Sequence, residues 1–217
     1  MKQISKMSRL VGQFEKAFRI LNEELFEGVL PTPIITAIPT PRAYAHYTPF
    51  DSWNTAEGGK PEINISTGSL DRPLENVLAS LLHEMVHLYN DRVLNIQDVS
   101  GNSRMYHNKQ FREQAEAHGL IVTRSEKYGW STTEPGDALL DLIILHDELR
   151  EIEICRTAPN PASLIGTHTG SGNPTPPTIG KPTHHRKYQC PRCGCSVRAT
   201  KAVRIGCLDC GVEMVEA

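Results

Sequence analysis

Two histidines and a glutamate lie close together in the segment His83-Glu84-Met85-Val86-His87. Residues four apart share one face of a helix, so His83 and His87 could both bind one metal ion. Glu84 lies next to the first histidine, where its carboxylate can take a proton from a water molecule. The alternative is an ordinary amphipathic helix with two surface histidines and a solvated glutamate. Apolar residues on both sides of the motif argue against it, because a buried charged group needs a partner such as a metal ion.

A third ligand would complete this metal site. The metzincin pattern requires a glycine and a histidine three and six residues after the second histidine, and Asn90 and Val93 occupy those positions. A thermolysin-like enzyme uses a downstream glutamate, for which Glu113 and Glu116 are the candidates. His107 offers a third imidazole at the start of the next predicted helix. The spacing of these residues leaves both kinds of ligand open.

A second group of metal-binding side chains lies near the C-terminus. Cys190 and Cys193 form one Cys-x-x-Cys pair, Cys207 and Cys210 form another, and 13 residues separate the pairs. Four thiolates predict a closed, tetrahedral structural zinc site. A module of about 30 residues has too little core to fold alone, so zinc binding would supply its folding free energy. Cys195 is a spare thiol, and the redox-pair alternative lacks the thioredoxin-like pattern of strands and helices.

The cysteine-rich segment is basic. Between residues 181 and 217 there are seven Lys and Arg and three Asp and Glu residues, a side-chain balance of +4. A basic ribbon on a tether suits contact with the phosphate backbone of DNA, and the alternative is a solvated face on a small fold. The predicted phosphate contacts are Arg192, Arg198, Lys201 and Arg204.

The composition is that of an ordinary globular protein. The chain has 217 residues, of which 39% are hydrophobic and 22% are charged, with a net charge of −2. No apolar run is long enough to cross a membrane, and the N-terminus lacks the apolar segment of a signal peptide, so we expect a cytoplasmic protein. A stretch rich in Pro, Gly, Ser and Thr separates two parts of the chain. The predicted organisation is a main domain at 1–156, a flexible linker at 157–187 and a zinc ribbon at 188–217.

The pattern of apolar residues predicts an α+β fold in which helices pack on a small antiparallel sheet. Asp71 is the expected N-cap of the helix that carries the histidine motif, which should end at about Asn90. A polar loop then leads from Asp98 to Arg104, and Tyr128 to Trp130 read as a turn. The predicted helices are 3–27, 72–90, 107–119 and 138–149, and the predicted strands are 34–38, 43–48, 62–66 and 121–123, with 49–59 as a loop.

Four segments in this order resemble the SprT-like (Spartan-type) zinc metalloprotease family. They are Leu21-Asn-Glu-Glu-Leu-Phe26-Glu-Gly-Val-Leu-Pro31, Glu62-Ile-Asn-Ile65, His83-Glu84-Met-Val-His87 and His107-Asn-Lys-Gln-Phe111. The resemblance covers residues 10 to 120 and the zinc ribbon. The segment Gly129-Trp-Ser-Thr-Thr133 and the long linker are not assigned to it.

The resemblance implies a zincin-like protease domain with two zinc ions. The catalytic ion would have His83, His87 and His107 as ligands and Glu84 as the general base, and the structural ion would have the four paired cysteines. The substrates implied are proteins bound or crosslinked to DNA. Two other classes of function are considered: a catalytically idle, zinc-stabilised DNA-binding adaptor, and a zinc hydrolase of a non-peptide substrate. A catalytically idle adaptor would not need a general base such as Glu84. Tyr106, Tyr89, Tyr47 and His46 are the candidate donors to a developing oxyanion.

Overall fold

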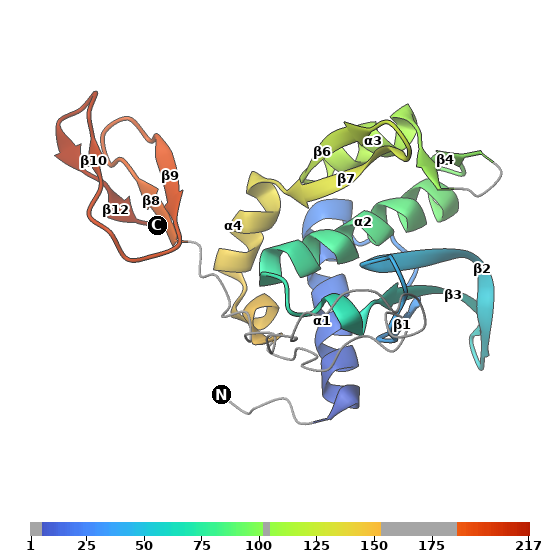
Figure 1. Ribbon diagram of the computed structural model, residues 1–217. Helices are drawn as coiled ribbons and strands as arrows, with labels where there is room; N and C mark the ends of the chain where they lie inside the picture. Colours follow the sequence, from blue (N-terminus) through green and yellow to red (C-terminus); the bar gives the residue numbers. More distant parts are fainter. Residues whose placement is uncertain (1–5, 102–104, 153–185) are drawn as a thin grey trace, which may run out of the picture.

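The computed structural model describes residues 6–101, 105–152 and 186–217 of the chain. The described residues form an α+β fold with four α-helices and small mixed sheets, as the sequence predicts (Figure 1). Residues 157–185 of the predicted linker, and Cys155, lie outside the described residues. Within the described residues, no helix is both long enough and apolar enough to cross a membrane.

The first helix, α1 (Met7–Phe26), packs one apolar face into the core. Glu27 and Gly28, with φ angles of 55° and 72°, end the helix in the left-handed conformation. The side chain of Asn22 then bonds both backbone groups of Leu30, its Oδ1 accepting from the N–H at 3.1 Å and its Nδ2 donating to the carbonyl at 3.2 Å. These bonds fix the direction in which the chain enters the first sheet.

The first sheet contains β1 (Ile34–Thr36), β2 (Ala45–Thr55) and β3 (Gly58–Ile65) in the order β1-β3-β2. The prediction of an antiparallel meander is wrong for β1, which pairs parallel with β3, while β2 and β3 are antiparallel. The buried side chain of Asn64, on β3, helps to hold β1 in this parallel pairing, because it bonds both backbone groups of Ile38 just after β1. The predicted loop at 49–59 is also wrong, since β2 continues to Thr55 and forms a hairpin with β3.

The central helix, α2 (Leu74–Arg92), carries the histidine motif. It runs between the first sheet and the second sheet, with α1 crossing behind it (Figure 1). Its N-cap is Pro73, which has no capping side chain, so the prediction of Asp71 as N-cap is wrong. The chain turns between Ser69 and Arg72 before the helix begins, and Asp71 lies exposed in that turn.

The second sheet covers the other side of α2. Its strands, in the order β4-β5-β7-β6, are β4 (Val99–Ser100), β5 (Tyr106–His107), β7 (Gly129–Pro135) and β6 (Leu120–Ser125). The predicted turn at 128–130 is therefore wrong at its end, because Gly129 opens β7. The remaining elements of the main domain are α3 (Lys109–Ala117), α4 (Asp137–Leu145) and a 3-10 helix (Asp147–Glu151).

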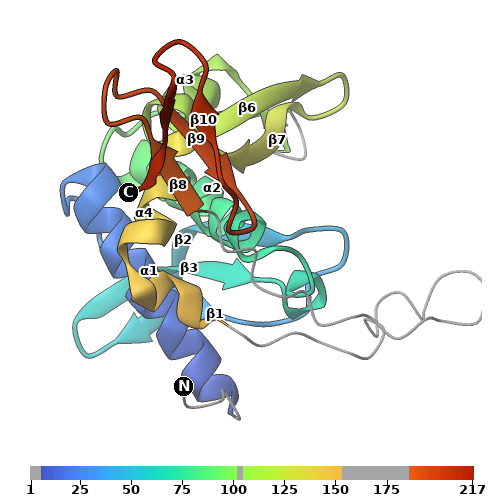
Figure 2. The ribbon, with the colours of Figure 1, turned by 90° about the vertical axis from the view of Figure 1, so that its left-hand side faces the viewer.

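The C-terminal residues form a small all-β module with its own core. It contains β8 (Arg186–Gln189), β9 (Ser196–Ala199), β10 (Gly206–Cys207), β11 (Val212–Glu213) and β12 (Val215–Glu216). Its buried side chains are Tyr188, Cys190, Cys207 and Met214, and none of them belongs to the core of the main domain. This arrangement is compatible with a zinc ribbon, and we call it the ribbon module. Figure 2 shows its strands in front of the main domain.

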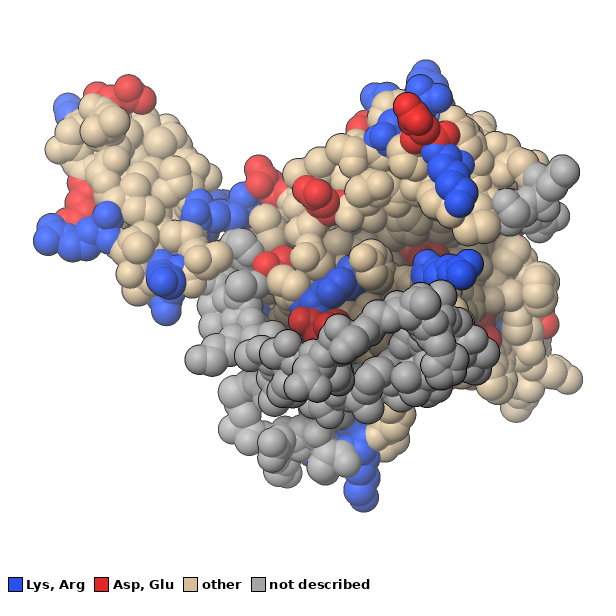
Figure 3. All heavy atoms as spheres, viewed as in Figure 1, with Lys and Arg blue, Asp and Glu red and all other residues tan. Residues whose placement is uncertain are grey.

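The ribbon module contacts α4 through ion pairs. The guanidinium group of Arg198 pairs with the carboxylates of Asp137 and Asp141, at 2.6 Å for Asp141. Lys187 lies 3.5 Å from the same Asp141. Blue and red side chains meet at this junction in Figure 3. The sequence analysis expected a module tethered only by the linker, and the structure differs because these charges attract one another across the junction.

Candidate metal centre

Three histidine side chains converge above α2. The Nε2 atom of His107 lies 3.1 Å from the Nε2 atoms of both His83 and His87, which are themselves 3.2 Å apart. The edge of a tetrahedron with metal–nitrogen bonds of 2.0–2.1 Å is about 3.3 Å long. His83 and His87 come from successive turns of α2, and His107 comes from β5. We call these three residues the histidine cluster, and their spacing fits one metal ion.

The hydrogen-bond partners of the Nδ1 atoms show which way the Nε2 lone pairs of these rings point. His87 Nδ1 donates to Asp98 Oδ2 at 2.7 Å, and His107 Nδ1 donates to the carbonyl oxygen of Met105 at 3.2 Å. His83 Nδ1 lies 3.1 Å from the hydroxyl oxygen of Thr133. A carboxylate and a carbonyl can only accept, so the neutral rings of His87 and His107 carry their proton on Nδ1. Their Nε2 lone pairs then face the centre of the cluster, where a cation would satisfy them together.

The surroundings of the cluster disfavour protonation of two of its members. Burial lowers the pKa of His83 and lowers the pKa of His107 to about 4. Burial acts in the same direction on His87, but the hydrogen bond and negative charge of Asp98 outweigh it and raise the pKa of that ring. A proton and a metal ion therefore compete for Nε2 of His87.

A buried phenylalanine supports all three rings. The centroid of the Phe111 ring lies 4.6 Å from the centroid of each histidine ring, and Phe111 is fully buried. Asn108 fixes this segment, because its Oδ1 accepts from the backbone N–H groups of Gln110 and Phe111 at the start of α3. The same short segment thus delivers His107 as a candidate ligand and Phe111 as the floor of the site.

Asp98 is a buried residue of the site that the sequence analysis did not identify. Its Oδ2 atom accepts from His87 Nδ1 and, at 2.8 Å, from Asn90 Nδ2. Only 7% of its surface is exposed. A carboxylate in this position orients the imidazole and raises its basicity toward a metal ion. The position of Asp98 in the sequence does not predict its contact with His87, because a loop of irregular conformation brings it back to α2.

Gly129 determines where His107 lies. It has a φ of 67°, and a Cβ atom at this position would lie 2.2 Å from the carbonyl oxygen of His107. The backbone N–H of His107 donates to the carbonyl of Tyr128 at 2.9 Å, which joins β5 to β7. Only glycine fits this approach of two backbones. The sequence analysis saw Gly129 as part of a turn and missed this role.

The glutamates considered as third ligands point elsewhere. Glu113 pairs with Lys109 at 3.0 Å, and Glu116 pairs with Arg112 at 3.1 Å, both along the outer face of α3. Among the candidates, the structure therefore brings His107, and neither glutamate, to His83 and His87.

Glu84 lies buried beside the cluster, with 6% of its surface exposed. Burial raises the pKa of its carboxyl group to about 7, against the opposing effects of nearby His87 and a hydrogen bond from the backbone N–H of Tyr47. Glu84 and the histidine cluster line a cleft of about 1880 Å³. This hollow is visible at the centre of Figure 3. A carboxylate with this pKa, beside an open cleft, can exchange a proton with a bound molecule near neutral pH.

The four candidate oxyanion donors differ in their hydrogen-bond partners and in whether they line the cleft. Tyr47 donates its hydroxyl proton to Asp91 Oδ2 at 2.5 Å, and Tyr89 packs against the core and does not line the cleft. Tyr106 lines the cleft and its hydroxyl oxygen accepts from Arg124, which leaves its own proton free. His46 also lines the cleft, and its Nδ1 has no hydrogen-bond partner among the described residues. Tyr106 and His46 therefore remain as candidates.

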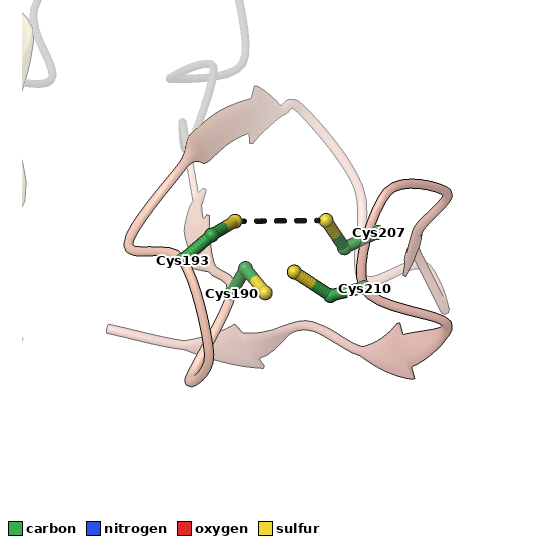
Figure 4. Close-up of side chains that lie close together, drawn as sticks. All are labelled: Cys190, Cys193, Cys207 and Cys210. Carbon is green, nitrogen blue, oxygen red and sulfur yellow. Dashed lines mark hydrogen bonds between the residues drawn. The ribbon is translucent and has the colours of Figure 1, made fainter.

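Four cysteine side chains point toward one another in the ribbon module (Figure 4). The Sγ atoms of Cys190, Cys193, Cys207 and Cys210 all lie within 4.8 Å of one another, and those of Cys193 and Cys207 are 3.7 Å apart. A tetrahedron with metal–sulfur bonds of 2.3 Å has edges of about 3.8 Å. Cys195 is exposed and is not one of the four. The cysteine cluster thus has the size of a tetrathiolate metal site.

Each Cys-x-x-Cys pair is followed by a glycine that closes a turn. Gly194 and Gly211 have φ angles of 75° and 65°, and their N–H groups donate to the carbonyls of Cys190 and Cys207. In the first turn, the backbone N–H groups of Cys193 and Arg192 donate to the sulfur of Cys190 and lower its pKa to about 6. The first turn therefore favours the thiolate of Cys190, which is the metal-binding form of cysteine, whereas the neighbouring sulfur atoms raise the pKa of Cys210 in the second turn.

A scan against protein-family models, a search of curated proteins and a search of solved structures each returned no match.

The predicted phosphate contacts of the ribbon module differ in their surroundings. Arg198 pairs with Asp137 and Asp141, and Arg204 donates two hydrogen bonds to Glu213, at 2.8 and 3.1 Å. Arg192 donates to the carbonyl of Cys210 at 3.4 Å, and Lys201 is exposed. In the described part of the chain, Arg192 and Lys201 have no carboxylate partner. Of the four predicted phosphate contacts, these two are the ones whose charge is not already paired with a carboxylate.

We expect His107→Ala to lower the metal content by one ion per chain and to leave the cysteine-bound ion in place, because two imidazoles without the third hold a metal ion weakly. Glu113→Ala is the matched control on the neighbouring helix and should retain both ions. Elemental analysis of the two purified variants measures the number of metal ions per chain. Full occupancy in His107→Ala would show that His107 is not a ligand.

Gly129→Ala should weaken binding at the histidine cluster by about 10–100-fold, the usual effect of displacing the support of a ligand. Gly12→Ala is the control, since a Cβ at Gly12 meets no atom within 4 Å. Competition with a chelator, followed by elemental analysis, compares the two variants. Equal affinity in Gly129→Ala and Gly12→Ala would contradict the positioning role of Gly129.

Proposed function

We propose that this protein is a zinc-dependent metallopeptidase of the SprT-like type, with a zincin-like main domain and a zinc ribbon. The observation that carries the proposal is the convergence of three imidazole Nε2 atoms beside the buried carboxylate of Glu84, within an open cleft. A purely structural metal site has no use for an acid–base group in this position. The idle-adaptor alternative therefore leaves Glu84 unexplained.

The donor atoms favour zinc as the metal at both clusters. Three imidazoles form a catalytic donor set that leaves one position open, whereas four thiolates form a closed structural set. An ion held by the histidines would supply Lewis acidity and would lower the pKa of a water molecule. The proposed cofactors are one catalytic and one structural zinc ion.

The chain's own residues would then carry the proton. Glu84 would accept a proton from the attacking water and return it to the departing amine. The N–H of Tyr47 holds the Glu84 carboxylate, and Asp98 holds the ring of His87 in one tautomer. Proton transfer between two heavy atoms requires fixed geometry, which these two contacts provide.

The shape of the cleft favours a polypeptide over a small molecule. Residues 42–47, which lead into and begin β2, line one side of it, and β2 is an edge strand of the first sheet. An edge strand has unpaired backbone groups that can bond an extended polypeptide. This feature supports peptide hydrolysis over hydrolysis of another bond.

Glu84→Gln should lower the rate of proteolysis by about 10²–10⁴-fold and leave the metal content unchanged, because glutamine has nearly the same size but cannot take a proton. The matched control is Glu113→Gln, which makes the same change on the outer face of α3. Cleavage of an unfolded protein such as casein, together with elemental analysis, gives both readouts. An active Glu84→Gln protein would rule out the proposed mechanism.

We also propose that the ribbon module brings the protease to DNA-bound proteins. Two of its cations, Arg192 and Lys201, have no carboxylate partner among the described residues and are suited to phosphate contact. Binding of the ribbon module to the DNA that carries a substrate protein would raise the local concentration of that substrate near the cleft. Arg198 is engaged with α4 and would have to leave Asp137 and Asp141 to contact a phosphate.

A chain that ends at residue 156 should stay folded and keep one metal ion, because the main domain and the ribbon module have separate cores. It should also bind DNA more weakly than the full chain, with a shallower dependence on salt. Fluorescence anisotropy with single- and double-stranded oligonucleotides, at several salt concentrations, compares the two chains. Identical affinities would exclude the ribbon module as the DNA-binding element.

A further inference from the structure

Arg72 is a cationic side chain of the cleft that the proposed mechanism does not use. The carbon atom at the centre of its guanidinium group lies 3.8 Å from the centroid of the Tyr44 ring. Its Nε donates to the carbonyl of Ser69 at 3.1 Å, and its Nη2 donates to the hydroxyl of Ser80 at 3.0 Å. A ring face and two hydrogen bonds from different elements hold the plane of the guanidinium group in one orientation.

The nearest negative charge that acts on Arg72 is that of the neighbouring Asp71, which is exposed to solvent. Its hydrogen bonds go to the neutral oxygen atoms of Ser69 and Ser80, and no carboxylate in the described ranges forms an ion pair with it. Burial lowers the pKa of its guanidinium group, as expected for a cation that has lost part of its water. A half-buried cation that no carboxylate contacts directly is favourably placed to bind an anion.

The cleft connects Arg72 to the histidine cluster. Asn76, Ser80 and His83 follow Arg72 at helical spacings along α2, and all of them line the cleft. The Nη2 atom of Arg72 lies 3.0 Å from Ser80 Oγ, and Ser80 precedes His83 by three residues, or about 4.5 Å along α2. An extended polypeptide covers about 3.3 Å per residue. A chain cleaved at the histidine cluster would thus place a residue about two positions away beside the guanidinium group of Arg72.

We propose that Arg72 forms an anion-binding subsite of the cleft, which takes the carboxylate of an Asp or Glu side chain about two residues from the cleaved bond. Ser69 and Ser80 occupy Nε and Nη2, so Nη1 is the nitrogen left for this ligand. The inference rests on the proposed function, because it assumes that the cleft binds a polypeptide.

The geometry favours a carboxylate side chain over a nucleic-acid backbone. One nitrogen of one fixed guanidinium group suits a single anionic group, whereas strand binding uses a row of cations and exposed stacking surfaces. An acidic position in a peptide substrate is therefore the ligand that we assign to the subsite.

The test measures peptide binding to the full-length Glu84→Gln chain, which does not consume its ligand. The probes are labelled peptides of one length in which a single Glu moves through every position, and a matched set with Gln in its place. We expect Glu to bind about tenfold more tightly than Gln at one or two adjacent positions, the gain of one charge-assisted hydrogen bond. No difference between Glu and Gln at any position would overturn the proposal, and this comparison needs no change at Arg72.

Arg72→Gln, added to the same chain, should remove the preference for Glu and leave the affinity for the Gln peptides unchanged. Arg112→Gln is the matched control, since the guanidinium group of Arg112 also lies over a ring, 4.5 Å from the centroid of Trp130, but does not line the cleft. Arg72→Glu should favour peptides with Lys at the same position. A preference for Glu that persists in Arg72→Gln would overturn the assignment.

Failure of the Arg72 subsite and failure of the protease proposal give different results. If the chain with Glu84 intact cleaves no peptide or protein, but Arg72→Gln still removes the preference for Glu, the protease proposal fails and the subsite stands. If the chain cleaves Glu and Gln peptides equally well, the protease proposal stands and the subsite fails. Loss of oligonucleotide affinity in Arg72→Gln, with unchanged peptide affinity, would also overturn the subsite.

Discussion

The mutual approach of three imidazole lone pairs is the constraint that shapes this protein. Asp98 and Met105 accept the outer protons of His87 and His107, so the inner nitrogen atoms of those rings can only accept. With His83 they meet within 3.2 Å. A cation between them would remove the repulsion. The buried helix, the ring of Phe111 and the backbone contact at Gly129 hold the three rings in this arrangement.

The parts of the site that follow local spacing could be predicted from the sequence. His83 and His87 are four residues apart on one helix, and each cysteine pair brackets one turn, so neighbouring residues alone bring these ligands together. Asp98, Thr133 and Gly129 could not be found in this way. Asp98 reaches the histidine cluster from the loop before β4, and Thr133 and Gly129 both reach it from β7, so their positions depend on how the second sheet packs on α2.

The fold shows the same division between local and distant contacts. The helices and the α+β class follow from the repeat of apolar residues, which identifies the buried face of an element. That repeat says nothing of the direction of the neighbouring strand, and the parallel pairing of β1 with β3 depends on hydrogen bonds from Asn64 to residues that follow β1. The contact of Arg198 with α4 depends likewise on charges that are far apart in the chain.

The distribution of the histidines along the chain has a consequence for stability. His83 and His87 lie on one helix, whereas His107 follows His87 by 20 residues and reaches it through a polar loop. An ion bound by all three would act as a cross-link that closes this loop, as a disulfide does. Closing a loop of this length removes chain entropy from the unfolded state worth about 3 kcal/mol. The ion that would serve the chemistry would thus also anchor the second sheet to α2, and chelation would loosen β4 and β5 before the rest of the core.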